Sequence, residues 1–327
     1  MKNIKLFLMI LAAVLLLPSC EKEIVFDGEI DDPLLVVNAW TSPDSLIKAH
    51  VSQSKFFLSN LEGFKVIKNA NVQLFVNGQL HEQLVGDDFG MYTGTYKAVV
   101  GDTLRIVVQA PTLGQAESKT VILPKADIMS VDTTHTKQTV NVYTDGPDTM
   151  YVDKSIECDF RVRLRDPGNE QNYYRMVVKN VTINTFDEEQ YVNEYFMSFI
   201  LEGMDTQTGG FFDIIGGEEN WESEYYITDE LFNGKEFILR FKHNYGYREY
   251  SQEFKDMNGI NGSTSERLDI NLQSITRDTY LYLVSKKSAE NNIDGFFSEP
   301  VQIFNNIENG IGIFGSYNNS VTPIQLY

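Results

Sequence analysis

The chain has 327 residues, with 27 Lys and Arg side chains against 46 Asp and Glu side chains and a formal net charge of −19. A chain this acidic is excluded from the nucleic-acid-binding proteins, because affinity for nucleic acid depends on neutralising phosphates with basic side chains. Attachment to an anionic bilayer by charge is excluded for the same reason. The length suggests two domains, and 23 glycines with 17 Tyr and 21 Phe are typical of many strands and tight turns.

The N-terminal segment has the pattern of a secretory signal. Lys2 and Lys5 precede an apolar run from Leu6 to Leu17, and the small residue Ser19 stands directly before Cys20. A basic start, an apolar stretch of about a dozen residues and a small-residue exit are typical of a signal peptide. The run is too short to span a bilayer comfortably, which argues against a membrane anchor.

A bacterial lipobox has a branched apolar residue three places before its cysteine, and Leu17 supplies it. We therefore predict that residues 1–20 are a lipoprotein signal peptide and that Cys20 is acylated, with palmitate-type chains, on its sulfur and amine. Residues 21–33 then form a tether. The alternatives are a signal without lipidation and a short membrane anchor. Without residues 1–19 the net charge is −21, so the acyl chains would have to provide membrane attachment.

Residues 34–124 have the pattern of a small β-sandwich. Leu34 to Trp40 is a compact apolar run, and Asn71 to Val76 alternates up to Asn77-Gly78, the strongest short hairpin signal. Short strands with turns about every ten residues predict an immunoglobulin-like sandwich domain. Further strands of this domain are predicted at 90–92, 103–108 and 120–124.

Residues 125–327 are predicted to form a second β-rich domain, which makes the fold mainly all-β with two sandwich-like domains. A polar stretch from Asp132 to Asp153 is interpreted as a long loop or irregular hairpin. Ser274 to Glu290 contains neither Gly nor Pro and predicts one packed helix with Ser274 as its cap. Strands are predicted at 160–165, at 173–183 as the return strand, at 237–241 and at 311–315.

The sequence contains no motif that assigns catalysis. Its histidines are far apart, without the short spacing of zinc ligands: His50, His81, His135 and His243. Nucleophile elbows, His-Glu-x-x-His motifs and phosphate-binding glycine loops are absent. Cys158 is the only thiol besides Cys20, and its strand-like surroundings favour a buried small hydrophobe. We predict no catalytic residue, metal site or cofactor. A hydrolase with two carboxylates stays open, because such a pair needs no local motif.

Residues 184–235 are the candidate contact region. Aromatic side chains between glycine pairs are typical of loops that bind a ligand or a protein. The alternative is that these rings fill the core of the second sandwich, where aromatic side chains are common. The predicted contact residues are Phe211, Phe212, Trp221, Tyr225 and Tyr226.

Several stretches carry a resemblance to a known family: Leu35–Trp40, Asp229–Lys235, Ile275–Leu283, Ser298–Val301 and Asn305–Gly315. The last of them looks like the C-terminal signature of the domain of unknown function 4249 family, a group of Bacteroidota outer-membrane lipoproteins. Glycines in this signature allow a close backbone approach or a bulge in a final strand. The resemblance implies a lipoprotein found beside TonB-dependent transporters, and it supplies no catalytic residues.

We therefore predict a non-catalytic outer-membrane lipoprotein that is an accessory or ligand-capturing partner of a TonB-dependent transporter. A surface hydrolase and a structural envelope protein are the alternatives. Asp132-Thr133-Thr134 and Asp148-Thr149-Met150 also resemble the O-glycosylation sequence of exported Bacteroidota proteins. Thr133 and Thr149 lie in the polar stretch between the domains, where a glycan would disturb no core.

Overall fold

The computed structural model describes residues 32–56, 63–145, 148–168, 170–186, 189–202, 222–258, 263–292 and 301–326. The predicted signal peptide, including Cys20, lies outside these ranges. Pro33–Tyr327 forms one compact unit. Within the described ranges, no helix is long and apolar enough to cross a membrane.

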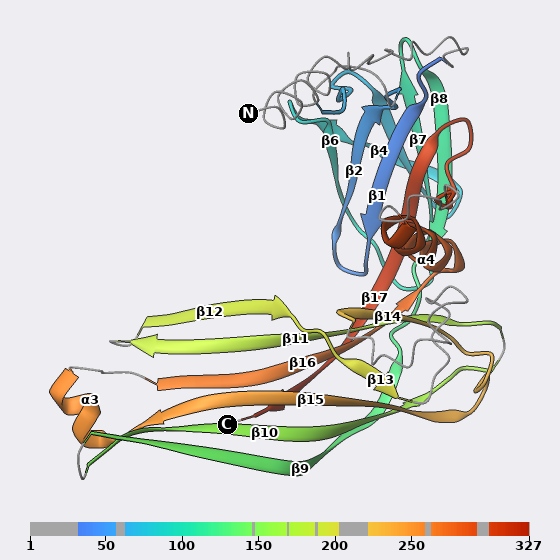
Figure 1. Cartoon of the computed structure of the whole chain (residues 1–327). Helices are drawn as coiled ribbons and strands as arrows, with labels where there is room; N and C mark the ends of the chain where they lie inside the picture. Colours follow the sequence, from blue (N-terminus) through green and yellow to red (C-terminus); the bar gives the residue numbers. More distant parts are fainter. Residues whose placement is uncertain are drawn as a thin grey trace, which may run out of the picture. The chain divides into compact units, whose positions relative to one another are not determined.

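The first half of the unit consists of two sheets that enclose one core (Figure 1). One sheet contains β1 (Leu35–Thr41), β2 (Leu46–Gln53), β5 (Val85–Gly86) and β6 (Met91–Lys97). The other contains β3 (Asn71–Val76), β4 (Gln79–Gln83), β7 (Thr103–Ala110) and β8 (Gly114–Val121). Alternate residues of these strands point inward, as in β1, where Leu35, Val37 and Ala39 are buried.

The second half of the unit also encloses a core between two sheets. A four-stranded sheet contains β9 (Asp127–Asp145), β10 (Asp148–Arg165), β13 (Ile200–Glu202) and β15 (Glu236–Tyr250). The facing strands are β11 (Tyr173–Phe186), β12 (Glu189–Phe196), β14 (Glu224–Thr228), β16 (Ser263–Ile275) and β17 (Ile311–Gln325). The helices in the part of the chain that the structure describes are α3 (Gln252–Asn258) and α4 (Arg277–Asn292).

Strand β17 joins the two halves into one sheet of nine strands. Its residues Ile311 to Ser316 pair in parallel with β1, and its residues Tyr317 to Gln325 pair antiparallel with β16 (Figure 1). The strand order is β12-β11-β16-β17-β1-β2-β6-β5, with β14 also paired to β11. The predicted division at residue 124 stays a prediction, but β17 pairs with strands from both sides of it.

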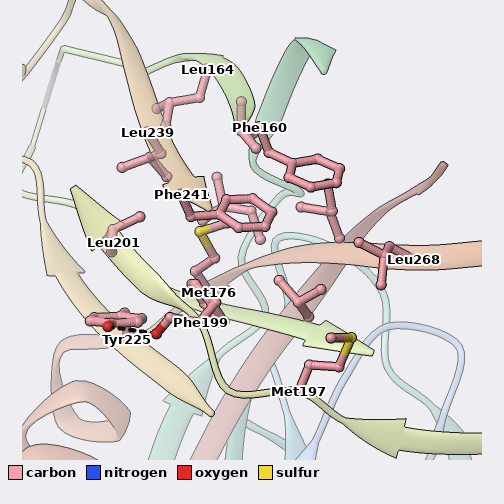
Figure 2. Close-up of a cluster of buried hydrophobic side chains, with 14 of the residues drawn as sticks. Phe160, Leu164, Met176, Met197, Phe199, Leu201, Tyr225, Leu239, Phe241 and Leu268 are labelled. Carbon is pink, nitrogen blue, oxygen red and sulfur yellow. Dashed lines mark hydrogen bonds between the residues drawn. The ribbon is translucent and has the colours of Figure 1, made fainter. Parts of the chain in front are cut away.

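The core of the second half is rich in aromatic side chains (Figure 2). The rings of Phe160 and Phe241 stack with their centroids 4.7 Å apart, and Phe199 lies 5.2 Å from Phe241. Cys158 belongs to this core with 1% of its surface exposed, and burial raises the pKa of its thiol. The predicted burial of Cys158 is therefore confirmed.

Several predicted elements are confirmed and others are corrected. Asn77 and Gly78 turn with φ of 52° and 84°, which are the left-handed values of a tight hairpin turn. The polar stretch is the β9–β10 hairpin with three register shifts, so the hairpin alternative is confirmed. The return-strand prediction is wrong, because β11 pairs with β12, β14 and β16 and not with β10.

The predicted helix is confirmed with shifted ends. It begins at Arg277, because Ser274 belongs to β16, where nine pairs with β17 hold the strand extended as far as Ile275. Thr276 replaces Ser274 as the cap: its hydroxyl accepts a 3.4 Å hydrogen bond from Thr279 N.

Residues of the C-terminal signature hydrogen-bond the backbone of β17 and let it approach β1 closely. Asn306 accepts a 2.9 Å hydrogen bond from Phe314 N and donates one of 3.1 Å to Phe314 O. Gly312 has a φ of 125°, and a Cβ there would lie 2.1 Å from the carbonyl oxygen of Val37. The close backbone approach predicted for the signature glycines is therefore confirmed at Gly312.

Candidate functional site

A groove of about 390 Å³ lies on one face of the nine-stranded sheet beside α4. This volume falls within the range of small-molecule sites. Five adjacent strands and the helix contribute the lining. These lining residues are Phe196 of β12; Arg175, Val177 and Lys179 of β11; Asn271, Gln273 and Ile275 of β16; Tyr317 and Asn319 of β17; Trp40 of β1; and Thr279 and Leu283 of α4.

The floor of the groove is a row of hydrogen-bonded polar side chains. Strand register places Arg175, Gln273 and Asn319 opposite one another on three neighbouring strands. Arg175 Nη1 donates to Gln273 Oε1 at 3.2 Å, and Gln273 Nε2 donates to Asn319 Oδ1 at 2.7 Å. Asn271 Nδ2 donates to the same Asn319 oxygen at 3.1 Å. Asn271 Oδ1 is buried and accepts no hydrogen bond from any described residue.

The two cations of the groove are neutralised by neighbouring carboxylates. Arg175 Nε donates to Glu224 Oε2 at 2.6 Å, and Lys179 Nζ lies 3.2 Å from Glu194 Oε2. Lys179 Nζ also lies 5.2 Å from the centroid of the Phe196 ring, within reach of a cation–π attraction. The groove therefore presents amides and aromatic rings rather than an unbalanced charge.

The aromatic wall at Trp40 depends on a glycine of the C-terminal signature. A Cβ at Gly315 would lie 2.9 Å from Trp40 Cζ3 and 2.9 Å from Thr279 Oγ1. The Trp40 ring meets Tyr282 of α4 edge to face at 5.8 Å. The helix is fixed to β17 because Thr279 Oγ1 accepts from Ser316 N at 3.1 Å. Gly315 therefore makes the room that both the tryptophan and the helix occupy.

A second cavity, of about 790 Å³, lies between the end of β8, the segment from Arg165 to Tyr174 and the start of α4. Its buried carboxylate, Asp166, accepts from Tyr174 Oη at 2.6 Å and from Gly234 N at 2.9 Å. Burial and this hydrogen bond raise the pKa of the Tyr174 phenol. Both carboxylate oxygens of Asp166 therefore accept hydrogen bonds from neighbouring segments of the chain. For this reason we take the groove beside α4, and not this cavity, as the better candidate for binding.

Two of the predicted contact residues belong to cores. Tyr225 and Tyr226 are each 3% exposed. Tyr225 Oη donates to Phe199 O at 2.9 Å (Figure 2), and Tyr226 packs against Ile275 and Tyr280. Buried rings cannot form a contact surface, so the prediction is wrong for these two and the core alternative holds. Phe211, Phe212 and Trp221 lie outside the described residues.

The predicted glycosylation residues lie on exposed positions of paired strands. Thr133 of β9 is opposite Phe160, and Thr149 of β10 is opposite Thr144. Both side chains are accessible to a modifying enzyme, and their glycosylation stays a prediction.

The described part of the chain does not group three or more His, Cys, Asp or Glu side chains as a metal site would require. His243 is 7% exposed, and burial lowers its pKa to about 4. His135 is exposed on β9. These two histidines therefore differ in environment as well as in sequence position.

Sequence reasoning missed the groove because its residues are separated by up to 279 positions in the chain. The local signal was present in two strands. Asn271 and Gln273 of β16, and Tyr317 and Asn319 of β17, stand two positions apart, so each pair lies on one face of its strand. Alternation predicts a shared face, but it does not reveal that β17 stands between β1 and β16.

Comparison with known proteins identifies the family. No curated protein is significantly similar in sequence. Among solved structures, one chain from work on promiscuous carbohydrate-binding modules of the β-sandwich superfamily aligns with 67% of this chain and 96% of its own length. Its sequence identity is 10% and its TM-score is 0.18, too low to support any argument about fold or function. The chain belongs to the family described as domain of unknown function (DUF4249), whose model matches residues 21–322.

Proposed function

We propose that this protein is a non-catalytic outer-membrane lipoprotein that captures a ligand as the accessory partner of a TonB-dependent transporter. The groove carries the binding part of this proposal, because it combines aromatic walls with a floor of amides. Amide side chains donate and accept hydrogen bonds but do not exchange protons near neutral pH. Such a lining suits recognition better than reaction chemistry.

The membrane part of the proposal rests on the sequence before the folded unit. A lipobox-like Leu17 to Cys20 precedes a match to the family that begins at residue 21. Acyl chains on Cys20 would hold the unit at the membrane, where its negative charge gives no affinity of its own. The resemblance to lipoproteins found beside TonB-dependent transporters supplies the expected partner.

The test is made in native outer membranes with a C-terminally tagged chain and its Cys20→Ala variant. We expect the wild type to stay in the membrane pellet after a salt wash and to co-purify with a TonB-dependent transporter identified by mass spectrometry. The variant should move to the soluble fraction, since at least one acyl chain is needed for anchoring.

A Cys158→Ala variant is the matched control, because its thiol is buried in the second core and cannot reach a lipid-modifying enzyme. A Cys20→Ala chain that still pelleted would refute the lipid anchor. A purified wild type without any transporter would refute the accessory role, and turnover of a polysaccharide or peptide panel would favour the hydrolase alternative.

A further inference from the structure

We infer that the groove beside α4 binds a neutral saccharide through the aromatic rings of Trp40 and Phe196 and the amides of Asn271, Gln273 and Asn319. This inference rests on the proposed capture function and adds to it the site and the chemical class of the ligand.

The floor has hydrogen-bonding capacity that the described residues leave unused. Asn271 Oδ1 is buried without a donor among the described residues. A buried acceptor without a partner is costly, so it is expected to receive a donor from a bound group or an ordered water. The amides of Gln273 and Asn319 lie beside it in one hydrogen-bonded row. A row of amides matches adjacent hydroxyls, which both donate and accept.

The walls present aromatic surface that the core does not use. Trp40 is 36% exposed and Phe196 is 57% exposed, although both line the groove. The C–H faces of a sugar ring stack on such surfaces, which are large and apolar. Their strands, β1 and β12, are four strand steps apart in the sheet order, and the pairing register places Phe196 level with Pro323 but Trp40 level with Gly315, eight residues away along β17. The two rings therefore lie at opposite ends of the groove, roughly 30 Å apart at the usual strand and residue spacings. This length fits a chain of several linked sugar units better than a single ring.

The charge balance selects a neutral ligand. The two basic side chains in the lining are already paired, Arg175 with Glu224 and Lys179 with Glu194. An anionic ligand would have to displace these carboxylates, and it would approach a chain with a net charge of −19. A cationic ligand would find no Asp or Glu side chain among the described lining residues of the groove.

An extended peptide fits this place less well than a saccharide. Peptides commonly bind by adding a strand to a free sheet edge, where the main chain offers unpaired groups. The groove lies on a sheet face, and the backbones of β11, β16 and β17 pair with one another along its floor. Side chains alone are available there, and six of the twelve that line the groove are amides or aromatic rings.

The inference is tested by calorimetric titration of the full mature chain in a detergent without a sugar head group. The probes are short neutral oligosaccharides of glucose, xylose, mannose or N-acetylglucosamine, with a uronic-acid oligosaccharide and an uncharged peptide beside them. We expect at least one neutral saccharide to bind with a Kd of about 1 mM or tighter. Phe196→Ala and Asn271→Ala should each weaken that binding about tenfold or more.

The matched controls are Tyr195→Ala, an exposed ring on the opposite face of β12, and Asn141→Ala, an exposed amide on β9. Both should bind as the wild type does. A Trp221→Phe background leaves Trp40 as the only tryptophan, so its fluorescence should shift on saccharide binding.

The inference is overturned if no neutral saccharide binds at about 1 mM, if Phe196→Ala binds normally, or if only the peptide or the uronate binds. These results leave co-purification with the transporter untouched, so they would reject the saccharide site without rejecting the accessory role. Conversely, saccharide binding without a co-purifying transporter would retain the site and reject that role.

Discussion

At the scale of single residues, burial decides which polar groups of this protein are chemically active. Tyr226 Oη donates a hydrogen bond to Glu224 Oε1 at 2.5 Å. Burial, as the larger cause, and this hydrogen bond, as the second, raise the pKa of the Tyr226 phenol. His243 is buried in the second half of the unit, where its pKa falls to about 4. Neither group is set to exchange protons near neutral pH.

His243 gives a prediction about acid stability. Between its ordinary pKa of 6.5 and its folded pKa of about 4, the unfolded chain binds a proton that the folded chain does not. The free energy of unfolding should therefore fall as the pH drops through this window, by about 3 kcal/mol from this residue. Urea titrations at several pH values measure it. His243→Gln should lose this part of the slope, whereas the exposed His135→Gln should keep it; identical slopes would contradict the assignment.

At the scale of secondary-structure elements, β17 makes two close approaches, one to β1 at Gly312 and one to Trp40 and α4 at Gly315. Gly312 lets β17 lie against Val37 of β1, and Gly315 leaves room for the Trp40 ring and the Thr279 hydroxyl. Beyond them, Ser316 Oγ donates to Val121 O at 2.5 Å and Asn318 Nδ2 to Leu123 O at 2.8 Å. The strand is therefore fixed on both faces where it passes from β1 to β16.

Gly312→Ala tests this close approach. A Cβ 2.1 Å from Val37 O must force the strands apart, so we expect the substitution to cost about 3 kcal/mol or more in unfolding free energy. Gly114→Ala is the control, since its φ is 79° but nothing lies within 4 Å of the added atom. It should cost about 1 kcal/mol from the backbone conformation alone. Equal losses in chemical denaturation would show that the approach of β17 to β1 is not constrained.

At the scale of the whole molecule, the hydrophobic core of the first half of the unit includes residues from the C-terminal part of the chain. Ile307 and Phe314 are 3% and 0% exposed within the core formed by residues 35–122. Removing two large buried apolar side chains lowers the free energy of unfolding by about 3–5 kcal/mol each, which together is most of the stability of a small domain. The first half of the unit therefore depends on the C-terminal segment.

A fragment of residues 33–124 should accordingly be unfolded or molten, with poor dispersion in its amide NMR spectrum. Adding a peptide of residues 301–327 should restore dispersion, because it supplies Ile307, Phe314 and the partner strand of β1. A scrambled peptide of the same composition is the control. A fragment that is fully folded by itself would contradict this dependence.

The sequence by itself determined the mainly all-β fold, the family, the Asn77-Gly78 hairpin, the packed helix and the burial of Cys158. These features follow from local signals: alternation along a strand, turn residues that accept positive φ, and a run without Gly or Pro. The tertiary structure alone decided that Tyr225 and Tyr226 are core residues and that the groove exists. Alternation shows which side chains share a face but not which strand is the neighbour. Only the pairing of β17 with both β1 and β16 brings Trp40, Gln273 and Asn319 together.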